Sequence, residues 1–506
     1  MTKSETTQDG TVKNSRRLVR RGLWSLLWLG VVLSLSSTAH AQVTKLTALD
    51  GEEGDAFGFS VSLSGGRALV GAYQDDNKTG SAYLFKSGRS TWTQEVKLTA
   101  SDAFVGDWFG VAASLDGERA VVGANLHDGV GSASGAAYVF EFDGTSWGEV
   151  ARLTASDAAS DDRFGGAISL DGDRVLIGAR GDADEGSDTG AAYIFDFDGT
   201  TWNQTAKLTA SDAAARDRFG VSVSLDGDLA IIGASLNDDL GSGSGSAYIF
   251  RFDGTSWVEE AKLTASDGAA TDRFGASVSL SGGRVLIGAF GHIAEAGAAY
   301  IFRFDGTAWV EEDRLSASDA ATGDNFGAAV ALDGDEALIG AWGNADAGLV
   351  TGSAYIFDFN GTTWVQQDKF IADAAAAGDG FGITVSLDGE GMLVGALSGA
   401  AYVYGPFVPV AIDDEAAVPD AYRLYANYPN PFNPSTEIRF DLPKAAHATL
   451  VIYDLMGREV TRLVDRPLPA GTHAVTWQAE GLSSGTYIYR LTAGAYSQAR
   501  SMVLFR

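Results

Sequence analysis

Aspartate is the residue type in this sequence that could most readily bind a metal ion or take part in catalysis, because it recurs at fixed spacing along most of the chain. One aspartate stands two residues before each of seven Phe-Gly pairs, at Asp55, Asp107, Asp162, Asp217, Asp272, Asp324 and Asp379. A second stands five residues earlier in six of these places, at Asp50, Asp102, Asp157, Asp212, Asp267 and Asp319. Carboxylate oxygens are the preferred ligands of hard cations such as Ca²⁺, and positioned carboxylates also serve in general acid–base catalysis.

The richest acidic stretch is Asp182-Ala183-Asp184-Glu185-Gly186-Ser187-Asp188. We take Asp182, Asp184 and Asp188 as candidate calcium ligands, because their carboxylates fall at alternate or nearby positions of one stretch. The alternative is that the repeated aspartates accept backbone N–H groups within their own turns. Recurrence in every copy favours this structural role, because turn chemistry must repeat with the fold.

Enzymatic chemistry has little support in the remaining residues. The chain has no cysteine and five histidines, of which only His127 and His292 lie outside the two ends of the chain. Serine–histidine–aspartate catalysis and histidine-based zinc sites both need more than two separated histidines. We therefore assign no catalytic residue and no cofactor-binding residue, and carboxylate-only catalysis stays open as an alternative.

The aspartates belong to a unit that the chain repeats seven times, with Phe-Gly pairs 52 or 55 residues apart. The copies begin at Lys45, Lys97, Arg152, Lys207, Lys262, Arg314 and Lys369. In the copy over 207–261, four runs rich in Val, Ile, Phe, Tyr and Trp indicate strands, at Phe219–Leu225, Leu229–Ala234, Ser246–Phe252 and Trp257–Leu263. Asp-Gly pairs between the first two and the last two runs predict tight hairpins. Seven four-stranded units predict an all-β chain with a seven-bladed β-propeller.

The seventh unit lacks a fourth strand, because it ends with its third run at Tyr404. The segment Gln42–Ala48 matches the end of the fourth strand of another copy, Glu95–Ala100. We therefore predict that the N-terminal segment completes the seventh blade and closes the ring. In such a ring the 4→1 and 2→3 connections emerge on one face, so the aspartates should gather there.

Charge and hydropathy restrict the cellular location and the possible partners of the protein. The net charge is −30, and residues 42–408 carry 21 basic and 54 acidic side chains. Such a surface disfavours nucleic acid and anionic membrane surfaces, and it favours cations or basic partners. Residues 1–41 have a basic start, an apolar run and an Ala39-His40-Ala41 end, which predicts a signal peptide cleaved before Gln42. No other stretch is apolar enough for a transmembrane span.

A second region begins where proline first appears, since all nine prolines lie at or after Pro406. We expect a propeller over 42–405, a linker over 406–420 and a small β-sandwich over 421–506. Its alternating runs are Glu437–Asp441, Ala448–Asp454, His473–Gln478, Thr486–Thr492 and Ser497–Leu504.

Two resemblances fit this division. The Phe-Gly and Gly-Ala pairs of 42–405 resemble the FG-GAP repeats of integrin α-subunit propellers. Such repeats often bind Ca²⁺ between their first two strands, but here that connection is only Asp-Gly or Ser-Gly, so the resemblance does not carry a calcium site over. The segment Leu424–Pro434, with Tyr453–Val460 and Ser484–Tyr487, resembles the type IX secretion C-terminal sorting domain. That resemblance implies passage through the inner membrane by the leader, then across the outer membrane by the type IX machinery, and cleavage near 406–420.

We therefore expect a secreted or cell-surface bacterial propeller that acts as a non-enzymatic binding or adhesion module. An unknown protein or glycan would bind its acidic loop face. The alternatives are an extracellular glycan hydrolase or lyase that uses loop carboxylates, and a structural propeller stabilised by Ca²⁺.

Overall fold

The computed structural model describes residues 43–405, apart from 89–90, 373–374 and 390, and residues 422–505, apart from 426, 428–429, 431, 480 and 495. The expected signal peptide over 1–41 and the expected linker over 406–420 lie outside the described residues.

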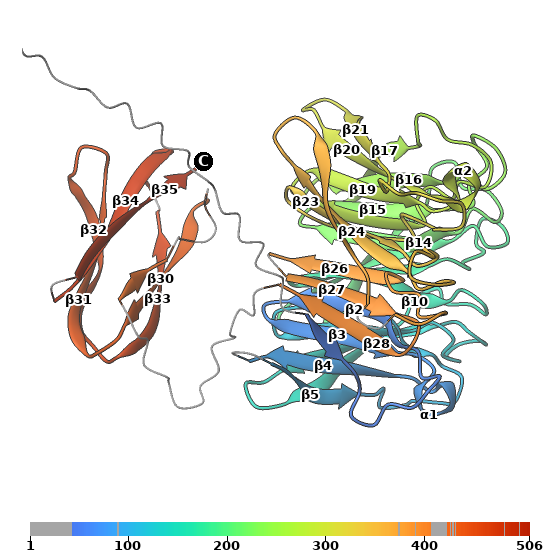
Figure 1. The fold of residues 1–506 in the computed structure, drawn as a ribbon, viewed down its shortest axis with the longest axis horizontal. Coiled ribbons are helices and arrows are strands. Elements are labelled where there is room, and N and C mark those ends of the chain that lie inside the picture. Colours follow the sequence, from blue (N-terminus) through green and yellow to red (C-terminus); the bar gives the residue numbers. More distant parts are fainter. Residues whose placement is uncertain are drawn as a thin grey trace, which may run out of the picture.

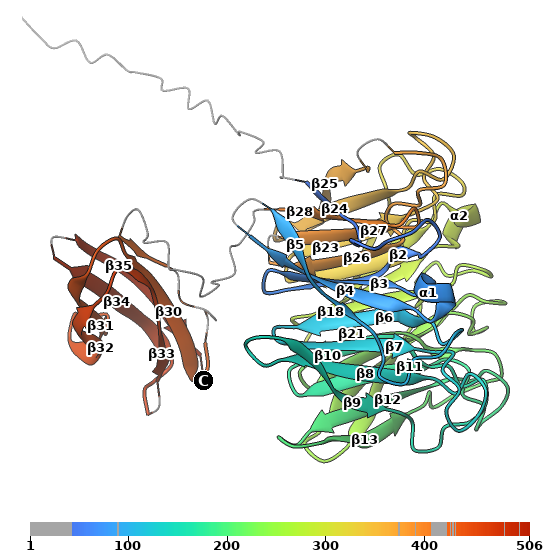
Figure 2. The same cartoon turned by 90° about the horizontal axis from the view of Figure 1, so that it is seen from below.

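The larger part is a ring of seven antiparallel sheets with four strands each (Figures 1 and 2). The first four blades are β2 (Phe57–Ser64), β3 (Arg67–Ala72), β4 (Ser81–Ser87) and β5 (Trp92–Leu98); β6 (Phe109–Asp116), β7 (Arg119–Ala124), β8 (Ala136–Phe142) and β9 (Trp147–Leu153); β10 (Phe164–Asp171), β11 (Arg174–Ala179), β12 (Ala191–Phe197) and β13 (Trp202–Leu208); and β14 (Phe219–Asp226), β15 (Leu229–Ala234), β16 (Ser246–Phe252) and β17 (Trp257–Leu263). The other three are β18 (Ser277–Ser281), β19 (Arg284–Ala289), β20 (Ala298–Phe304) and β21 (Trp309–Leu315); β22 (Ala329–Asp333), β23 (Glu336–Ala341), β24 (Ser353–Phe359) and β25 (Trp364–Phe370); and β26 (Thr384–Asp388), β27 (Gly391–Ala396), β28 (Ala400–Tyr404) and β1 (Thr44–Leu46). The predicted seven-bladed propeller is confirmed, and apolar clusters fill the space between neighbouring blades.

The ring closes as predicted, because β1 pairs with β28 and supplies the outer strand of the seventh blade. Thr44 lies opposite Val403 and Leu46 lies opposite Ala401. The Leu46 side chain is buried in the cluster between the seventh and first blades. The two ends of the propeller sequence are thus held together by hydrogen bonds and by a shared core.

Close backbone contacts explain the two glycines that mark each repeat. A Cβ on Gly233 would lie 2.0 Å from the carbonyl oxygen of Gly275 in the next blade. Gly275 itself has a φ of +83°, in the left-handed region that favours glycine. The same contact joins every pair of blades, as Gly71 with Gly110, Gly123 with Gly165, Gly178 with Gly220, Gly233 with Gly275, Gly288 with Gly327, Gly340 with Gly382 and Gly395 with Gly58. The Phe-Gly and Gly-Ala pairs therefore build the contact between blades.

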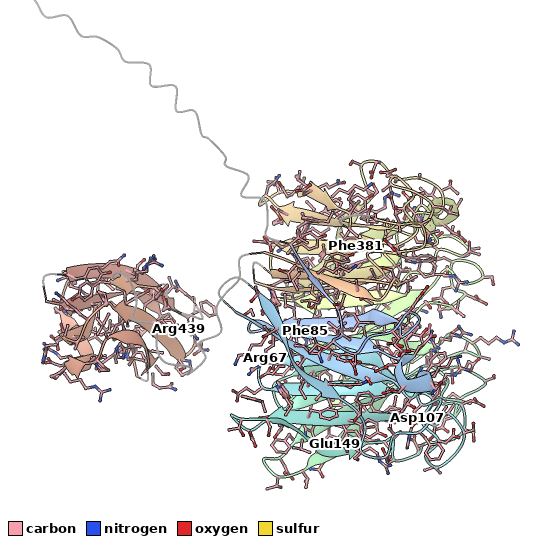
Figure 3. All side chains as sticks on the ribbon, turned by 60° about the horizontal axis from the view of Figure 1, so that its bottom comes forward. Arg67, Phe85, Asp107, Glu149, Phe381 and Arg439 are labelled. Atoms are coloured by element: carbon pink, nitrogen blue, oxygen red, sulfur yellow. The ribbon has the colours of Figure 1, made fainter. Side chains whose placement is uncertain are left out.

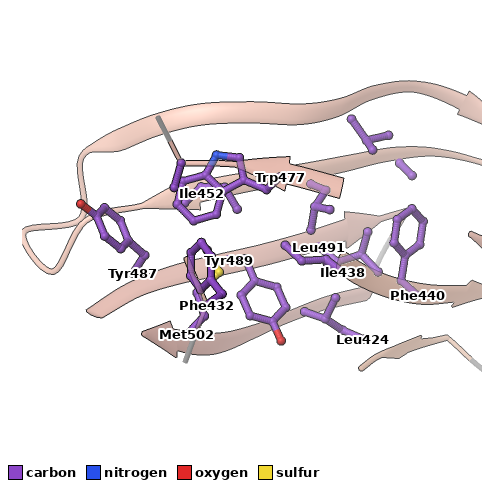
Figure 4. Close-up of a cluster of buried hydrophobic side chains, with 14 of the residues drawn as sticks. Leu424, Phe432, Ile438, Phe440, Ile452, Trp477, Tyr487, Tyr489, Leu491 and Met502 are labelled. Atoms are coloured by element: carbon purple, nitrogen blue, oxygen red, sulfur yellow. The ribbon is translucent and has the colours of Figure 1, made fainter. Parts of the chain in front are cut away.

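The described part of the C-terminal region is a β-sandwich of two sheets. One sheet orders β29 (Arg423–Leu424), β30 (Ser435–Leu442) and β33 (Gly471–Gln478), and the other orders β32 (Glu459–Leu468), β31 (Ala446–Tyr453), β34 (Gly485–Ala493) and β35 (Tyr496–Leu504). Phe432, Trp477, Tyr489 and Met502 are among the side chains of its core (Figure 4). Sequence reasoning missed β32, an edge strand in which Pro467 and exposed charged residues hide the alternation.

Helices contribute little to the described residues. The two short helices, α1 (Asp75–Lys78) and α2 (His292–Glu295), lie in 2→3 connections of the first and fifth blades. Neither is long enough to cross a membrane, and no other described segment forms such a helix.

Candidate functional site

The 4→1 and 2→3 connections emerge at one end of the propeller, which we call the loop face. Both short helices lie at this end in Figures 1 and 2. Figure 3 shows Asp107 on the loop face and Arg67, beside a tight hairpin, toward the opposite end. The structure therefore gathers the repeated aspartates on one face, as the sequence predicts.

The aspartates that precede Phe-Gly stabilise their own turns. Asp107 Oδ2 accepts a hydrogen bond from the backbone N–H of Phe104, three residues earlier, at 2.9 Å. All seven make this bond, with Glu52, Phe104, Ala159, Ala214, Ala269, Ala321 and Ala376 as donors. The structural interpretation is confirmed for these seven carboxylates.

The predicted acidic stretch meets a lysine from the fourth strand of its own blade. Lys207 Nζ lies 2.7 Å from Asp157, 2.9 Å from Asp182 and 2.7 Å from Asp184, measured to Oδ2 in each case. The hydroxyl of Tyr193 donates to Asp182 at 2.9 Å, and Lys207 Nζ lies 5.5 Å from the centre of the Tyr193 ring. Although burial opposes its charge, the three carboxylates hold the pKa of Lys207 above its usual value.

Two of the three candidate calcium ligands come together here. Carboxylate oxygens of Asp157, Asp182 and Asp184 lie within 4.8 Å of one another. Asp188 is outside this group, and Asp157 takes its place. The Lys207 ammonium already neutralises these oxygens, so a Ca²⁺ ion held by all three would have to displace it.

Similar clusters recur around the loop face. Each combines a basic residue of the fourth strand with an aspartate from the preceding 4→1 loop: Lys97 with Asp50, Arg152 with Asp102, Lys207 with Asp157, Lys262 with Asp212, Arg314 with Asp267 and Lys369 with Asp319. In the first, third, fourth and sixth blades the lysine also contacts aspartates of the 2→3 loop, namely Asp75 and Asp76, Asp182 and Asp184, Asp239, and Asp346. Much of the acidic charge of the face is therefore compensated within the chain.

Both propeller histidines belong to these clusters. His127 and His292 occupy the repeat position that Asp75 and Asp182 occupy in other blades. Their Nδ1 atoms lie 3.0 Å from Asp107 and 2.9 Å from Asp272, respectively. In these two blades a histidine replaces the carboxylate that other clusters have at this buried position. Its contact with the turn aspartate gives it a structural role.

A hollow of about 530 Å³ adjoins His127 on the loop face of the second blade. Asp102, Phe104 and Val105 line it from the 4→1 loop, and Asp128 and His127 line it from the 2→3 loop. It combines carboxylates with apolar side chains, which is the composition of many small-molecule sites.

Large apolar side chains stand exposed at the loop tips. Phe104 is 76% exposed, Val130 is 81% exposed and Leu349 is 74% exposed. Other exposed apolar residues on this face are Leu49, Val105, Leu240, Ile293, Ile371 and Leu397. Sequence reasoning stressed the acidic residues of the loops and missed this feature, which copy-by-copy comparison of the loop tips reveals.

Sequence reasoning singles out Trp108 and Trp342 as lying outside the repeated tryptophan position, but it did not bring together the residues at the inner edge of the loop face. First strands of neighbouring blades contact one another around the axis. The positions just before each Phe-Gly pair and just after each Gly-Ala pair therefore surround the axis at this end, and we call them the loop rim. They are Ala56, Tyr73, Trp108, Asn125, Arg163, Arg180, Arg218, Ser235, Arg273, Phe290, Asn325, Trp342, Gly380 and Leu397. These positions differ between copies, and that variation is the signal that could have revealed them.

The geometry defines the chain as a seven-bladed β-propeller of repeated four-stranded units, followed by a β-sandwich. A family model for the FG-GAP repeat matches seven times, at 40–85, 92–140, 147–195, 202–250, 257–302, 309–357 and 364–404. A second model, for the secretion system C-terminal sorting domain, matches 426–504. The chain belongs to the FG-GAP repeat family and carries a type IX sorting domain, which directs it to the cell surface or into the medium.

Several solved structures are similar to the chain. Virginiamycin B lyase from Staphylococcus aureus shares 8% identity, covering 72% of this chain and 99% of that chain with a TM-score of 0.45. PorZ, a surface component of the type IX secretion system of Porphyromonas gingivalis, shares 12% identity over 88% of this chain and 70% of that chain, with a TM-score of 0.28. Sqt1 from Chaetomium thermophilum shares 12% identity over 69% of this chain and 96% of that chain, with a TM-score of 0.43. No curated protein matches the chain.

Proposed function

We propose that the exported propeller is a non-enzymatic binding or adhesion module that contacts its ligand through the loop face. The observation that carries this proposal is the set of exposed apolar side chains at the loop tips, including Phe104, Val130 and Leu349. Exposed apolar groups gathered on one face of a secreted protein favour a contact surface, because leaving them in water is unfavourable.

The distribution of the repeated residues supports the same conclusion. The glycines, the turn aspartates and the lysine–aspartate clusters are occupied by interactions within the propeller. The residues that differ between copies lie mainly in the loops. Binding residues are often found on loops held by a rigid scaffold, so recognition should depend on these differences.

An enzyme that acts on extracellular glycans is the second candidate. The hollow beside Asp102 and His127 favours it, since carboxylates there could act as general acid and base. A structural role for Ca²⁺ is the third, with Asp182, Asp184 and Asp188 as the proposed ligands. Lys207 argues against this role while it occupies the cluster.

Export defines the other partner. Residues 421–506 would bind the type IX machinery, and cleavage within 406–420 would release the propeller or leave it attached to the cell surface. The N-terminal leader over 1–41 would direct passage through the inner membrane.

The test is a comparison of two triple variants of the exported chain on protein and glycan arrays. F104S/V130S/L349S removes three loop tips, and V150S/V258S/V310S removes three exposed valines from fourth strands as a matched control. We expect the loop variant to lose the array signals and the control to keep them. Signals that survive in the loop variant would contradict the proposal. Glycan cleavage that is abolished by Asp102→Asn would support the enzyme instead.

A further inference from the structure

Four arginines stand out on the loop rim of this strongly acidic protein: Arg163, Arg180, Arg218 and Arg273. All four are partly buried. Among the described residues, none of them forms an ion pair or donates a side-chain hydrogen bond. Arg273 instead lies over the ring of Phe290, 5.6 Å from its centre.

Strand register brings these arginines together. Phe164 pairs with Ala179, so Arg163 and Arg180 extend the same end of the β10–β11 ladder. Arg218 has the position of Arg163 in the next blade, and the close contact of Gly178 with Gly220 joins the two blades there. Arg273 has the same position one blade further. The third, fourth and fifth blades thus present one continuous cationic arc.

The arc is electrostatically unfavourable as it stands. Burial, together with the charges of Arg163 and Arg218, lowers the pKa of Arg180, and Asp188 opposes this effect only as a more weakly acting neighbour. Other propeller arginines show the contrasting arrangement. Arg119, for example, lies 2.8 Å from Glu141 and 2.9 Å from Asp173. Like charges held together without partners repel one another, and an anionic ligand would relieve that repulsion.

Aromatic side chains continue the rim on the neighbouring blades. The Tyr73 ring lies 4.9 Å from Trp108 and 4.6 Å from Phe59, measured between ring centres. Trp342 and Phe290 occupy rim positions of the sixth and fifth blades. Aromatic faces accept the apolar faces of sugar rings, whereas guanidinium groups form paired hydrogen bonds with carboxylate or sulfate.

We infer that the loop rim binds an anionic polysaccharide, with Arg163, Arg180, Arg218 and Arg273 holding its carboxylate or sulfate groups and the aromatic side chains of the rim contacting its sugar rings. This inference rests on the proposed binding function and names its ligand class. The neighbouring arginines suit a ligand with repeated negative charges. The combination of arginines with aromatic rings favours a charged carbohydrate over an acidic peptide.

The experiment uses the full exported chain and isothermal titration calorimetry. Alginate supplies carboxylates, dextran sulfate supplies sulfates, dextran is the neutral control and poly-glutamate is the acidic peptide. We expect alginate or dextran sulfate to bind at least tenfold more tightly than dextran and poly-glutamate, with an affinity that falls as salt rises. Equal binding of dextran, or equal or tighter binding of poly-glutamate, would overturn the inference.

Matched arginine variants locate the site. Arg180→Gln should lower the affinity for the anionic probe about tenfold, because it loses charge-assisted hydrogen bonds to the probe. R163Q/R180Q/R218Q should lower that affinity about a hundredfold or more for the same reason. Arg216→Gln removes the same charge from an exposed position outside the rim, so its affinity should stay within twofold. An equal loss in R216Q would show nonspecific attraction and contradict the site.

Folding and the broader proposal are separated by two further readouts. The triple variant should unfold at or above the wild-type denaturant midpoint, because it relieves repulsion; a lower midpoint with lost binding would contradict an unpaired site. If the array signals depend on the loop tips but the anionic probes fail to bind, the inference is wrong and the proposed function stands. If the anionic probes fail to bind and the array signals also persist in the loop-tip variant, both the inference and the proposed function are wrong.

Discussion

The two ends of the propeller axis are built from equivalent positions of the same repeat, yet they differ in kind. At the hairpin end, the last residues of the seven first strands form what we call the hairpin rim: Ser64, Asp116, Asp171, Asp226, Ser281, Asp333 and Asp388. Each side chain accepts a hydrogen bond from a backbone N–H in the next blade, namely from Gly117, Gly172, Gly227, Gly282, Gly334, Gly389 and Gly65. Seven bonds thus join the blades into a closed ring.

The loop rim has no such regularity. Its positions carry alanine, glycine, serine, asparagine, leucine, aromatic residues and four arginines. A side chain required to join blades must have the same chemistry in each copy, as at the hairpin rim. Where the copies diverge, the scaffold makes no such demand. Unpaired arginines at that end therefore point to an interaction with something outside the chain.

The charges of the two rims are also opposite. Five carboxylates surround the hairpin rim, and the pKa of Asp388 is raised by burial and by the charges of Asp333 and Asp116. Four guanidinium groups surround the loop rim. An anion should therefore approach the axis from the loop face and be repelled from the hairpin end.

Breaking the ring should affect both ends of the axis and produce the largest loss of stability. Deleting 42–48 removes the strand pairing of β1 and the buried Leu46 side chain. We expect the free energy of unfolding to fall by about 5 kcal/mol, from lost hydrogen bonds and a lost core residue. Urea denaturation measures this loss, and Leu46→Ala should account for about 2–4 kcal/mol of it. Val43→Ala, at an exposed position beside β1, is the control; an unchanged midpoint in the deletion would contradict closure by this strand.

The hairpin rim can be weakened without touching the loop rim. D116A/D171A/D226A removes three bonds between blades and should lower the free energy of unfolding by about 2–3 kcal/mol. D116N/D171N/D226N keeps an acceptor oxygen at each position and should lose less than about 1 kcal/mol. Both variants should bind the anionic probe as the wild type does. If binding fell with the hairpin rim, the two ends would not be separate in function.

The repeat predicts the propeller scaffold far better than it predicts the loop rim. The seven Phe-Gly pairs, the Asp-Gly turns and the missing fourth strand before Tyr404 predict the blade number, the hairpins and the ring closure. These follow from local rules applied in register. The turn role of Asp107 and its equivalents follows in the same way, because its partner lies three residues away.

The loop rim was not predicted, because its members are separated by dozens of residues and share no motif. Arg163 and Arg218 are brought together by the packing of blades, and Arg180 joins them through strand register. The lysine–aspartate clusters were missed for the same reason. Asp157 and Lys207 are 50 residues apart in the sequence. Without knowledge of the lysine that neutralises it, the acidic stretch at Asp182 resembled a metal-binding loop.

Two aspartates of one loop should respond to pH in opposite ways. Burial, with the charges of Asp182 and Asp157, raises the pKa of Asp162 to about 6, well above the ordinary value of an aspartate. The stability that the protonated form provides is therefore present below about pH 4 and lost as the pH rises through about 6. Despite burial, the hydrogen bond and the charge of Lys207 hold the pKa of Asp157 low. Its contribution is present above about pH 4 and lost as the pH falls further.

Asparagine variants test this difference. Relative to wild type, Asp162→Asn should gain about 2 kcal/mol in the free energy of unfolding between pH 4 and 7, because it does not acquire the unfavourable charge. Asp157→Asn should show the opposite slope below pH 4. Urea denaturation at each pH measures both. Parallel curves for the two variants would show that Lys207 does not distinguish these carboxylates.

The smallest effect concerns the lysine at the centre of the acidic cluster. Lys207→Ala leaves the buried Asp182 beside Asp157 and Asp184 without their cation, and should lower the free energy of unfolding by about 1 kcal/mol, since the cluster is partly exposed. The three carboxylates would then suit a hard cation. We expect Ca²⁺ to restore stability to this variant and to leave the wild type unchanged.

Lys262→Ala is the matched control, because its cluster holds only Asp212 and Asp239. It should lose a similar amount of stability and gain nothing from Ca²⁺, as two carboxylates offer too few ligands. Calcium stabilisation of the wild type would instead show that the ion displaces Lys207. In that case part of the loop face would be a cation site after all, and the contrast with the anion-binding loop rim would lie within one face and not only between the two ends of the axis.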